Sequence, residues 1–405
     1  MHKIERLLQT LAPKGVEFRK LGEVINILKG KQLNKDLLLD YGEYPVMNGG
    51  IHASGYWNEY NTDYPKIIIS QGGASAGYVN YMTSKFWAGA HCYAIELNSE
   101  KLNYKFLYYF LKNSQSILMK SQFGAGIPAL NKADIETLTI PIPPLEIQQE
   151  IVKILDAFTE LNTELNTELN ARKKQYEYYQ NMLLDFNDIN QSHKDAKERL
   201  AQKPYPKRLK TLLHTLAPKG VEFRKLGEVC DFQKGKSITK KAVTFGKIPV
   251  ISGGRQPAYY HNEANRSGET IAISSSGVYA GYVSYWDIPV FLADSFSVSP
   301  KQKTLMPKYL FHYLTTQQDA IHATKSTGGI PHVYSKDLQN FLIPIPPLEI
   351  QQEIVKILDQ FSLLTTDLLA GIPAEIKARK KQYEYYREKL LTFKPLTPHK
   401  EVDKE

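Results

Sequence analysis

The chain has 405 residues, a formal net charge of +9, 42% hydrophobic residues and 23% charged residues. This composition is typical of globular proteins, and no apolar run approaches the ~20 residues that cross a bilayer, so we expect no membrane partner. Its two cysteines, Cys92 and Cys230, cannot form a disulfide framework, which favours a cytoplasmic protein. The positive charge favours a polyanionic partner such as nucleic acid or an anionic membrane surface.

The N-terminal residues "MHKIERLLQTL" form a short amphipathic pattern without the apolar centre of a signal peptide. They lead into "LAPKGVEFRKLGEV", which runs from Leu11 to Val24 and recurs from Leu216 to Val229. "ARKKQYEYY" recurs in the same way, from Ala171 and from Ala378. Such internal repeats determine the architecture, and they indicate two tandem units of about 200 residues each.

The first unit opens with a domain that we place at residues 1–144. Within it, "KIIIS" (Lys66–Ser70) predicts a buried strand, and the glycine-rich "GGASAG" (Gly72–Gly77) predicts the turn that follows. "LNYKFLYYFLKNSQSILM" (Leu102–Met119) predicts a helix. The prolines of "IPIPP" (residues 140–144) end the domain, because they neither continue a sheet nor fit inside a helix. We therefore expect a mixed α/β domain.

A long helix is predicted at residues 145–186. The block "IPIPPLEIQQEIVKILD" (Ile140–Asp156) recurs from Ile343 to Asp359, and each copy opens an apolar run whose spacings of three and four residues indicate a heptad seam. About 40 residues make a helix of ~60 Å, too long to bury its stripe on one domain. We therefore expect the two long helices to pair as an antiparallel coiled coil. The predicted seam residues are Ile147, Ile151, Ile154, Phe158, Leu161 and Leu165, and Ile350, Ile354, Ile357, Phe361, Leu364 and Leu368.

A polar linker at residues 187–208 joins the units and ends in Pro-Tyr-Pro, and we interpret it as an exposed connector. "TLLHTLAPKG" after this linker matches "RLLQTLAPKG" near the N-terminus. Residues 1–12 are therefore expected to take, beside the second long helix, the place that the linker takes beside the first. This makes the two units pseudo-symmetric.

The second unit repeats the plan with a domain at 209–347, a long helix at 348–392 and a polar tail at 393–405. "ETIAISS" (Glu269–Ser275) predicts a strand and "PKYLFHYLTTQQDAI" (Pro307–Ile321) a helix. The second long helix holds four extra residues, including Pro373. Either a kink at this proline or an irregular linker explains them.

No pattern in the sequence predicts catalysis. "KGKS" (Lys234–Ser237) fails as a phosphate loop, because Cys230 stands where that motif requires its first glycine. His91 and Cys92 align with Ser295 and Phe296, and neighbouring residues of a strand point to opposite faces, so we interpret them as a satisfied histidine and a packed small residue. We predict no catalytic residue, no metal site and no cofactor.

Loops that combine basic, polar and aromatic residues are where the two copies differ most. Arginine pairs with guanine and glutamine with adenine in the major groove, and lysines contact phosphates, so these loops are the candidate DNA-binding elements. For any single lysine a solvated surface charge remains the commoner explanation. The candidates are Lys31, Asn34, Lys35, Gln71, Ser75, Gln122 and Lys132 in the first unit, and Lys236, Lys240, Lys241, Arg255, Gln256, Arg266, Ser275, Tyr279 and Lys325 in the second.

The two "IPIPPLEIQQEIVKILD" blocks, each after a variable domain and before a long helix, together with the repeated "LAPKGVEFRKLGEV", resemble the specificity subunits of type I restriction–modification systems over essentially the whole chain. The resemblance implies two target-recognition domains that each read half of an asymmetric, bipartite DNA sequence. It also implies a helical spacer that docks methyltransferase subunits, two of them, and it leaves open a restriction subunit. Methylation and cleavage would belong to the partner chains, so the protein would not be an enzyme.

The first long helix contains a tetrapeptide repeat, "LNTELNTELN" (Leu161–Asn170). Gain or loss of one repeat changes a helix by ~6 Å, close to two base pairs, which supports a spacer whose length sets the gap between half-sites. Two alternatives remain: a two-headed coiled-coil scaffold that binds proteins rather than DNA, and an orphan DNA-binding subunit without restriction partners.

Overall fold

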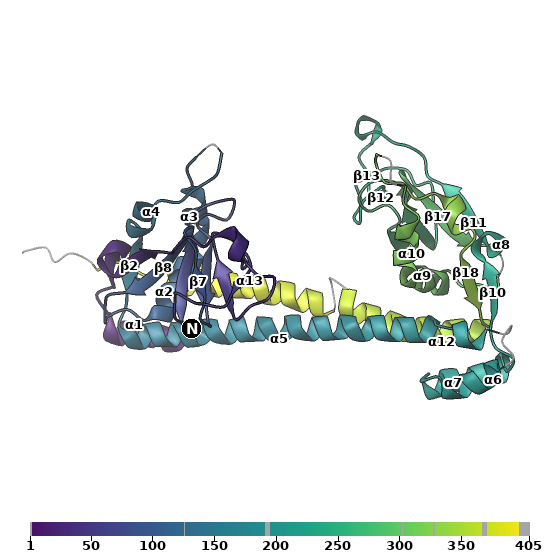
Figure 1. Cartoon of the computed structure of the whole chain (residues 1–405), viewed down its shortest axis with the longest axis horizontal. Coiled ribbons are helices and arrows are strands. Elements are labelled where there is room, and N and C mark those ends of the chain that lie inside the picture. The colour runs from purple at the N-terminus through teal and green to yellow at the C-terminus, as the bar shows by residue number, and fades with distance from the viewer. Residues whose placement is uncertain are drawn as a thin grey trace, which may run out of the picture. The chain divides into compact units, whose positions relative to one another are not determined.

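The computed structural model describes residues 2–124, 126–190, 195–301, 303–326, 329–366 and 371–396. The chain divides into two compact units, one made of Met1–Asn166 with Ile376–Glu405 and one made of Thr167–Glu375. Helices α5 (Leu145–Leu184) and α13 (Ile372–Leu391) contribute to both units (Figure 1). Within the described ranges, no helix is long and apolar enough to cross a membrane.

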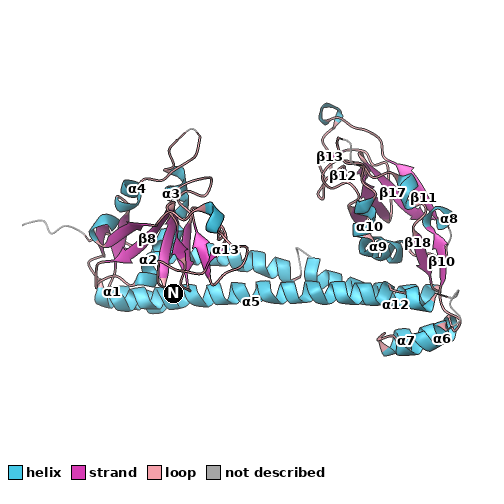
Figure 2. Ribbon diagram, viewed as in Figure 1, coloured by secondary structure: helices cyan, strands magenta, loops and turns pink. Residues whose placement is uncertain are grey.

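The first unit holds a mixed α/β domain with three small sheets (Figure 2). The four-stranded antiparallel sheet has the order β2-β8-β5-β6, a three-stranded sheet has the order β4-β3-β7, and β1 pairs with β9. The strands are β1 (Glu17–Lys20), β2 (Ile25–Lys29), β3 (Tyr44–Met47), β4 (Tyr56–Trp57), β5 (Lys66–Ser70), β6 (Val79–Met82), β7 (Trp87–Ala88), β8 (Cys92–Leu97) and β9 (Thr139–Ile142). The helices are α1 (His2–Leu11), η1 (Leu21–Glu23), η2 (Lys35–Leu37), α2 (Tyr104–Asn113), α3 (Gln115–Lys120) and α4 (Lys132–Glu136).

The second unit repeats these sheets in the orders β11-β17-β14-β15, β13-β12-β16 and β10-β18. Its strands are β10 (Glu222–Lys225), β11 (Cys230–Lys234), β12 (Ile248–Ile251), β13 (Tyr259–His261), β14 (Thr270–Ser274), β15 (Val283–Trp286), β16 (Phe291–Leu292), β17 (Ser295–Pro300) and β18 (Leu342–Ile345). Its helices are η3 (Asn187–Ile189), α6 (Ala196–Gln202), α7 (Lys207–Leu216), α8 (Leu226–Val229), η4 (Lys240–Ala242), α9 (Pro307–Thr316), α10 (Gln318–Ala323), α11 (Ser335–Leu338) and α12 (Leu348–Thr366).

The two predicted central strands are confirmed as β5 and β14. Ile67 and Ile69 lie in the main core of the first unit, whereas Ile68 packs in a second core on the other face of the sheet with Phe86. Because both faces are covered, the strand is a continuous apolar run rather than an alternating one.

The turn after each central strand depends on two glycines. Gly73 and Gly77 have φ of +80° and +86°, and Gly277 and Gly281 have +85° and +86°, values that side chains other than glycine rarely adopt. The turn prediction is therefore confirmed. The match between the copies is wider than the final Ala-Gly seen in the sequence, because the first glycine is shared as well.

The predicted helix 102–119 and its partner 307–321 are each two helices, α2 with α3 and α9 with α10, so both predictions are wrong in length. At the break, the side chain of Gln115 accepts a hydrogen bond from Val79 N at 3.0 Å, and that of Gln318 accepts one from Val283 N at 3.3 Å. The side chain of a residue at the start of the second helix thus binds the first residue of the edge strand, β6 or β15.

The prolines of "IPIPP" do not all lie outside the sheets as expected. Pro141 lies inside β9, opposite Phe18 of β1. A two-stranded sheet consists of edge strands only, where a residue without an N–H is tolerated.

The first long helix is confirmed as α5, but the second is two helices, α12 and α13. Pro373 is the second residue of α13, in the first turn, where proline destabilises a helix little. It therefore stands at the start of a new helix and does not kink a continuous one.

The predicted seam divides into two parts. Ile147, Ile151, Ile350 and Ile354 are fully buried. Their cores contain residues of their own domains and also residues of the neighbouring long helix, Leu390 and Leu391 of α13 in the first unit and Leu183 and Leu184 of α5 in the second. Phe158 stacks on Tyr386 of α13, with ring centroids 5.6 Å apart, and Phe361 stacks on Tyr179 of α5 at 5.0 Å. Ile154, Leu161, Leu165 and Ile357 are half-buried. Leu368 and the side chain of Leu364 lie outside the described part of the chain.

A fully buried glutamine fastens each long helix to its domain. The Gln148 amide donates to Lys101 O at 2.8 Å and to Pro143 O at 2.6 Å, and its oxygen accepts from Asn103 N at 2.7 Å. Gln351 repeats all three bonds, to Thr304 O, Pro346 O and Met306 N. Buried polar groups are costly unless paired, so three bonds in each unit fix the start of its long helix in one position.

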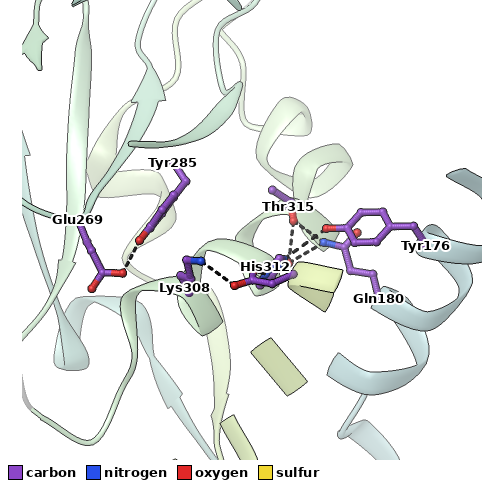
Figure 3. A network of polar contacts seen from close by, with 8 residues as sticks. Tyr176, Gln180, Glu269, Tyr285, Lys308, His312 and Thr315 are labelled. Carbon is purple, nitrogen blue, oxygen red and sulfur yellow. Dashed lines mark hydrogen bonds and ion pairs between the residues drawn. The ribbon is translucent and has the colours of Figure 1, made fainter. Parts of the chain in front are cut away.

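A network around a half-buried aspartate makes a second attachment in each unit. Asp156 binds Lys105, at 2.7 Å, and the hydroxyl of Tyr109. In the second unit Asp359 binds Lys308 at 2.6 Å and His312 at 3.1 Å, and Tyr176 approaches the other ring nitrogen of His312 at 3.3 Å (Figure 3).

These bonds also set the protonation of Asp359. Its partial burial raises the pKa, but the hydrogen bonds from His312 and Lys308 outweigh that effect and hold the pKa below the ordinary value.

The linker is not the exposed connector that we expected. Leu200 of α6 is 1% exposed and Tyr205 is 6% exposed, both in the core of the second unit, and Asn190 pairs with Val221. In the first unit the segment after α13 takes the matching place, where Pro395 pairs with Val16. Residues 191–194 and 397–405 lie outside the described ranges.

Candidate nucleic-acid interface

One end of each four-stranded sheet is built from loops that carry most of the candidate residues, and we call it the loop end. In the first unit it comprises residues 30–38, 48–54, 71–78, 89–91 and 121–131. In the second it comprises 235–243, 252–258, 275–282, 293–294 and 324–334. Residues 125, 327 and 328 within these segments are not described.

The strand register brings these segments together. Lys29 at the end of β2 faces Tyr93, and Ser70 at the end of β5 faces Cys92, the first residue of β8. The loop 121–131 joins them, because Gly73 N donates to Pro128 O at 2.8 Å and Leu130 N donates to Gln71 O at 2.8 Å. In the view of Figure 1, α3 and α4 lie on the side of the first domain away from α5, and β12 and β13 lie on the side of the second away from α12.

The candidates of the first unit gather at this end with different degrees of exposure. Lys31 and Lys35 are exposed, Ser75 is half-buried in the turn after β5, and the Asn34 side chain accepts from Asp36 N at 3.3 Å. Two glutamines are less accessible. The Gln122 amide donates a hydrogen bond to Ala76 O at 2.7 Å, and Gln71 is half-buried.

The second unit presents more positive charge at its loop end. Lys236, Lys240, Lys241 and Gln256 are exposed. Arg255 lies over the ring of Tyr279 at 4.9 Å, a cation–π contact that holds the guanidinium at the surface. Ser275 is half-buried next to β14, and Lys325 donates to Val278 O at 3.3 Å.

Two candidates differ from this pattern. Arg266, between β13 and β14, donates to the carbonyls of Gln233, Lys234 and Asn265 and to Ser297 Oγ, so most of its donors stabilise the domain itself. Lys132 begins α4 and forms an ion pair with Glu136 at 3.3 Å.

The structure also brings two residues to the loop end that our alignment of the copies placed incorrectly. Gln71 N donates to His91 O at 2.8 Å, and in the second unit Ser275 N donates to Asp294 O at 2.9 Å. His91 therefore matches Asp294, and Cys92 matches Ser295, one position away from the sequence alignment. His91 is exposed, and Cys92 is buried as expected.

A pocket of about 390 Å³ at the loop end of the second unit contains further polar and aromatic groups that the sequence did not single out. Asp294, His332, Tyr334 and Lys336 line it, and the rings of His332 and Tyr334 stack 6.0 Å apart. Alternation of basic and aromatic residues in "HVYSK" was the available signal.

Neither cysteine is suited to nucleophilic chemistry. Burial raises the pKa of Cys92 to about 12, and burial also raises that of Cys230 to about 12, so both thiols stay protonated at neutral pH. Among the described residues, no three histidine, cysteine or acidic side chains gather as a metal site would require. The loop ends have the basic, polar and aromatic character of a surface that binds nucleic acid.

Comparisons with known proteins identify the family of the chain. The family described as "Type I restriction modification DNA specificity domain" matches residues 13–174 and again 218–378. A chain of Haemophilus influenzae named as a type I restriction enzyme specificity subunit is 33% identical over 96% of this chain and 98% of its own length. The Escherichia coli EcoR124I/EcoR124II specificity subunit is 30% identical over 98% of each chain.

The fold is shared with a solved structure. The crystal structure of the type I restriction–modification S subunit from M. genitalium superposes with a TM-score of 0.64 at 23% identity, covering 93% of this chain and 96% of that one. The chain therefore belongs to the type I restriction–modification specificity family and contains its DNA specificity domain twice.

Proposed function

We propose that this protein is the DNA-binding specificity subunit of a type I restriction–modification complex and that each domain binds one half of an asymmetric, bipartite DNA sequence. The observation that carries the proposal is the loop end. The same strands build it in both units, but its side chains differ between them. A common frame with unlike side chains is what two different half-sites require.

The residues that we propose to contact DNA are the candidates exposed or half-buried at the loop ends. Lys31, Lys35, Lys236, Lys240 and Lys241 are suited to phosphates, and Arg255 with Gln256 is suited to base edges. Asn34, Gln71, Ser75, Gln122, Ser275, Tyr279 and Lys325 support or complete these contacts. We leave Arg266 and Lys132 out of this set because their charged groups are already engaged.

The long helices are proposed to pair as an antiparallel coiled coil that sets the gap between half-sites. The support is local to each unit: α5 contacts α13 through Phe158 and Tyr386, and contacts α12 through Tyr179 and Phe361. The repeat "LNTELNTELN" lies within α5, so one "LNTE" more or less changes this helix by ~6 Å, close to two base pairs.

The chemistry is proposed to belong to partner chains. We propose that two methyltransferase subunits dock on the two long-helix regions, one for each copy of the repeated blocks, and that a restriction subunit joins the complex. In this arrangement the chain is not itself an enzyme and needs no cofactor.

Selection of bound duplexes from a random DNA pool tests the proposal, with the chain alone and with the adenine methyltransferase subunit of the same cell. We expect two unlike short motifs at one fixed gap. Deletion of one "LNTE" should shorten the gap by about two base pairs without changing either motif.

A matched control is replacement of one "LNTE" by four other helix-forming residues, which should leave the gap unchanged. Recovery of no motif in either condition, with tight binding to another protein, would instead support a protein-binding scaffold. Recovery of motifs by the chain alone, in a genome without methyltransferase genes, would indicate an orphan subunit.

A further inference from the structure

His91 and Asp294 occupy the same backbone position in the two domains. Each ends the short turn that precedes a central strand, β8 or β17. The carbonyl of each accepts a hydrogen bond from the backbone N–H of the first residue after the neighbouring strand, Gln71 or Ser275. Gly30 N and Gly235 N bond to the carbonyls of the next residues, Cys92 and Ser295, at 2.9 and 2.8 Å, which fixes the same match independently.

The two side chains are exposed at this matched position and differ in hydrogen-bonding character. An aspartate carboxylate only accepts hydrogen bonds, whereas an imidazole always carries at least one N–H donor. The polar neighbours are matched too: Asn48 Oδ1 accepts from His91 N at 3.2 Å, and Ser252 Oγ donates to Asp294 Oδ2 at 3.3 Å. One position of a common frame therefore presents a donor in one domain and an acceptor in the other.

The carboxylate of Asp294 is unfavourable for binding the DNA backbone. It lines a pocket with Lys234 and Lys336, yet among the described residues it forms no ion pair. A carboxylate that approaches phosphates is repelled by them, so its presence in a basic surface weakens non-specific binding. A base contact offsets that cost, because aspartate accepts a hydrogen bond from the N4 amino group of cytosine.

We propose, on the basis of the proposed function, that His91 and Asp294 are matched base-reading residues, one in each half-site. His91 donates to the acceptors of guanine, O6 or N7, and Asp294 accepts from the amino group of cytosine. The difference between these two residues then makes the half-sites unlike at the corresponding position, whatever the surrounding loops add.

The test is selection from a random duplex pool with the full chain and the methyltransferase subunit of the same cell, comparing the wild type with Asp294→Asn and Asp294→His. Asparagine pairs with adenine, so Asp294→Asn should replace cytosine by adenine at one position of one half-site. Asp294→His should favour guanine there. Discrimination against the former base should change by roughly tenfold to a hundredfold. His91→Ala should relax one position of the other half-site.

Each variant carries its own folding control, because the unaltered domain must still select its half-site at the same gap. Asp231→Asn is a matched control, since this exposed carboxylate lies on β11 at the opposite end of the sheet and its replacement should leave both motifs unchanged. If the altered domain of a variant selects no bases, circular dichroism shows whether that variant is folded, and Asp294→Ser is tested in its place. If Asp294→Ser is folded and still selects cytosine, the inference is overturned.

The outcomes distinguish failure of this inference from failure of the proposed function. If the wild type yields a bipartite motif and Asp294→Asn yields the same motif with discrimination within twofold, the inference is overturned and the proposed function stands. If the wild type yields no motif, the proposed function fails and the inference with it. A change confined to one position of one half-site supports both.

Discussion

Replacement of Gln148 by alanine should destabilise the first unit strongly. The change removes three hydrogen bonds of a fully buried side chain and takes this partner from Lys101 O, Pro143 O and Asn103 N, of which the bond to Pro143 O is buried and the other two are part-buried. Each buried polar group left unpaired costs roughly 1–3 kcal/mol. We expect the lower end of the sum, about 3–4 kcal/mol, because a water molecule can enter the space of the lost side chain and bond to some of these groups. That is a large share of the ~5–15 kcal/mol that stabilises an ordinary domain.

Urea unfolding followed by circular dichroism, combined with amide hydrogen exchange to separate the units, measures this loss. Gln149→Ala is the matched control, since Gln149 is the exposed neighbour on the same helix turn and should change the free energy of unfolding by no more than ~0.5 kcal/mol. Gln148→Leu fills the space without restoring the bonds, so it should remain destabilised. If Gln148→Ala unfolds like Gln149→Ala, the buried bonds do not anchor the helix and our argument is wrong.

Three further predictions concern charge and helix pairing. Burial, together with the charge of Arg387, lowers the pKa of Lys112 from 10.5 to about 8, so the unfolded chain binds this proton more tightly than the folded chain between those pH values. The free energy of unfolding should therefore rise with pH across that window in the wild type but not in Lys112→Met. Urea unfolding at pH 7.5 and at pH 10 measures the difference. A double-mutant cycle on Phe158→Ala and Tyr386→Ala should give a coupling energy of about 0.5–1.5 kcal/mol, and a value near zero would remove the support for helix pairing in that unit. Lys236→Gln should weaken binding to all duplexes alike and lower the slope of log affinity against log salt by about 1, so a changed motif instead would reassign this lysine to base contact.

Periodicity and repetition were sufficient to predict much of the fold. The run "KIIIS" predicted β5 to the residue, and the heptad spacing predicted α5 from its first residue. These features are local, so they appear in the sequence without knowledge of what packs against them. The identical blocks predicted the tandem units because a duplicated frame retains its sequence where its packing is retained.

Features that depend on distant contacts were predicted less well. At the break between α2 and α3 the Gln115 side chain binds β6, and nothing in the local helical pattern indicates that bond. Ile147 and Ile151 have the spacing of a helix seam, but the spacing does not show that their core contains strands of the domain beside Leu390 and Leu391 of α13. The linker resembles a solvated connector because its polar residues outnumber Leu200 and Tyr205, which nevertheless anchor it.

At the candidate site the sequence predicted the loops but not the match between them. Between β7 and β8 the first copy has three residues, and between β16 and β17 the second has two, so an alignment without a gap pairs His91 with Ser295. The hydrogen bonds from Gln71 and Ser275, and independently those from Gly30 and Gly235, show that His91 matches Asp294. A single-residue difference in a turn was enough to hide the pair from the sequence.

The residues that anchor the helices and the residues proposed to read bases lie in different places, which explains how one fold can carry two specificities. Gln148 and Gln351 fasten the helices where "IPIPP" leaves each domain, whereas His91 and Asp294 lie at the loop end, and no described hydrogen bond joins the two sets. Substitutions without shared partners act almost additively. A change of base preference at the loop end therefore leaves the anchor intact, which lets the loops differ between the copies while the anchoring blocks stay identical. The converse also follows: a substitution at Gln148 should lower stability without altering which bases the folded protein selects.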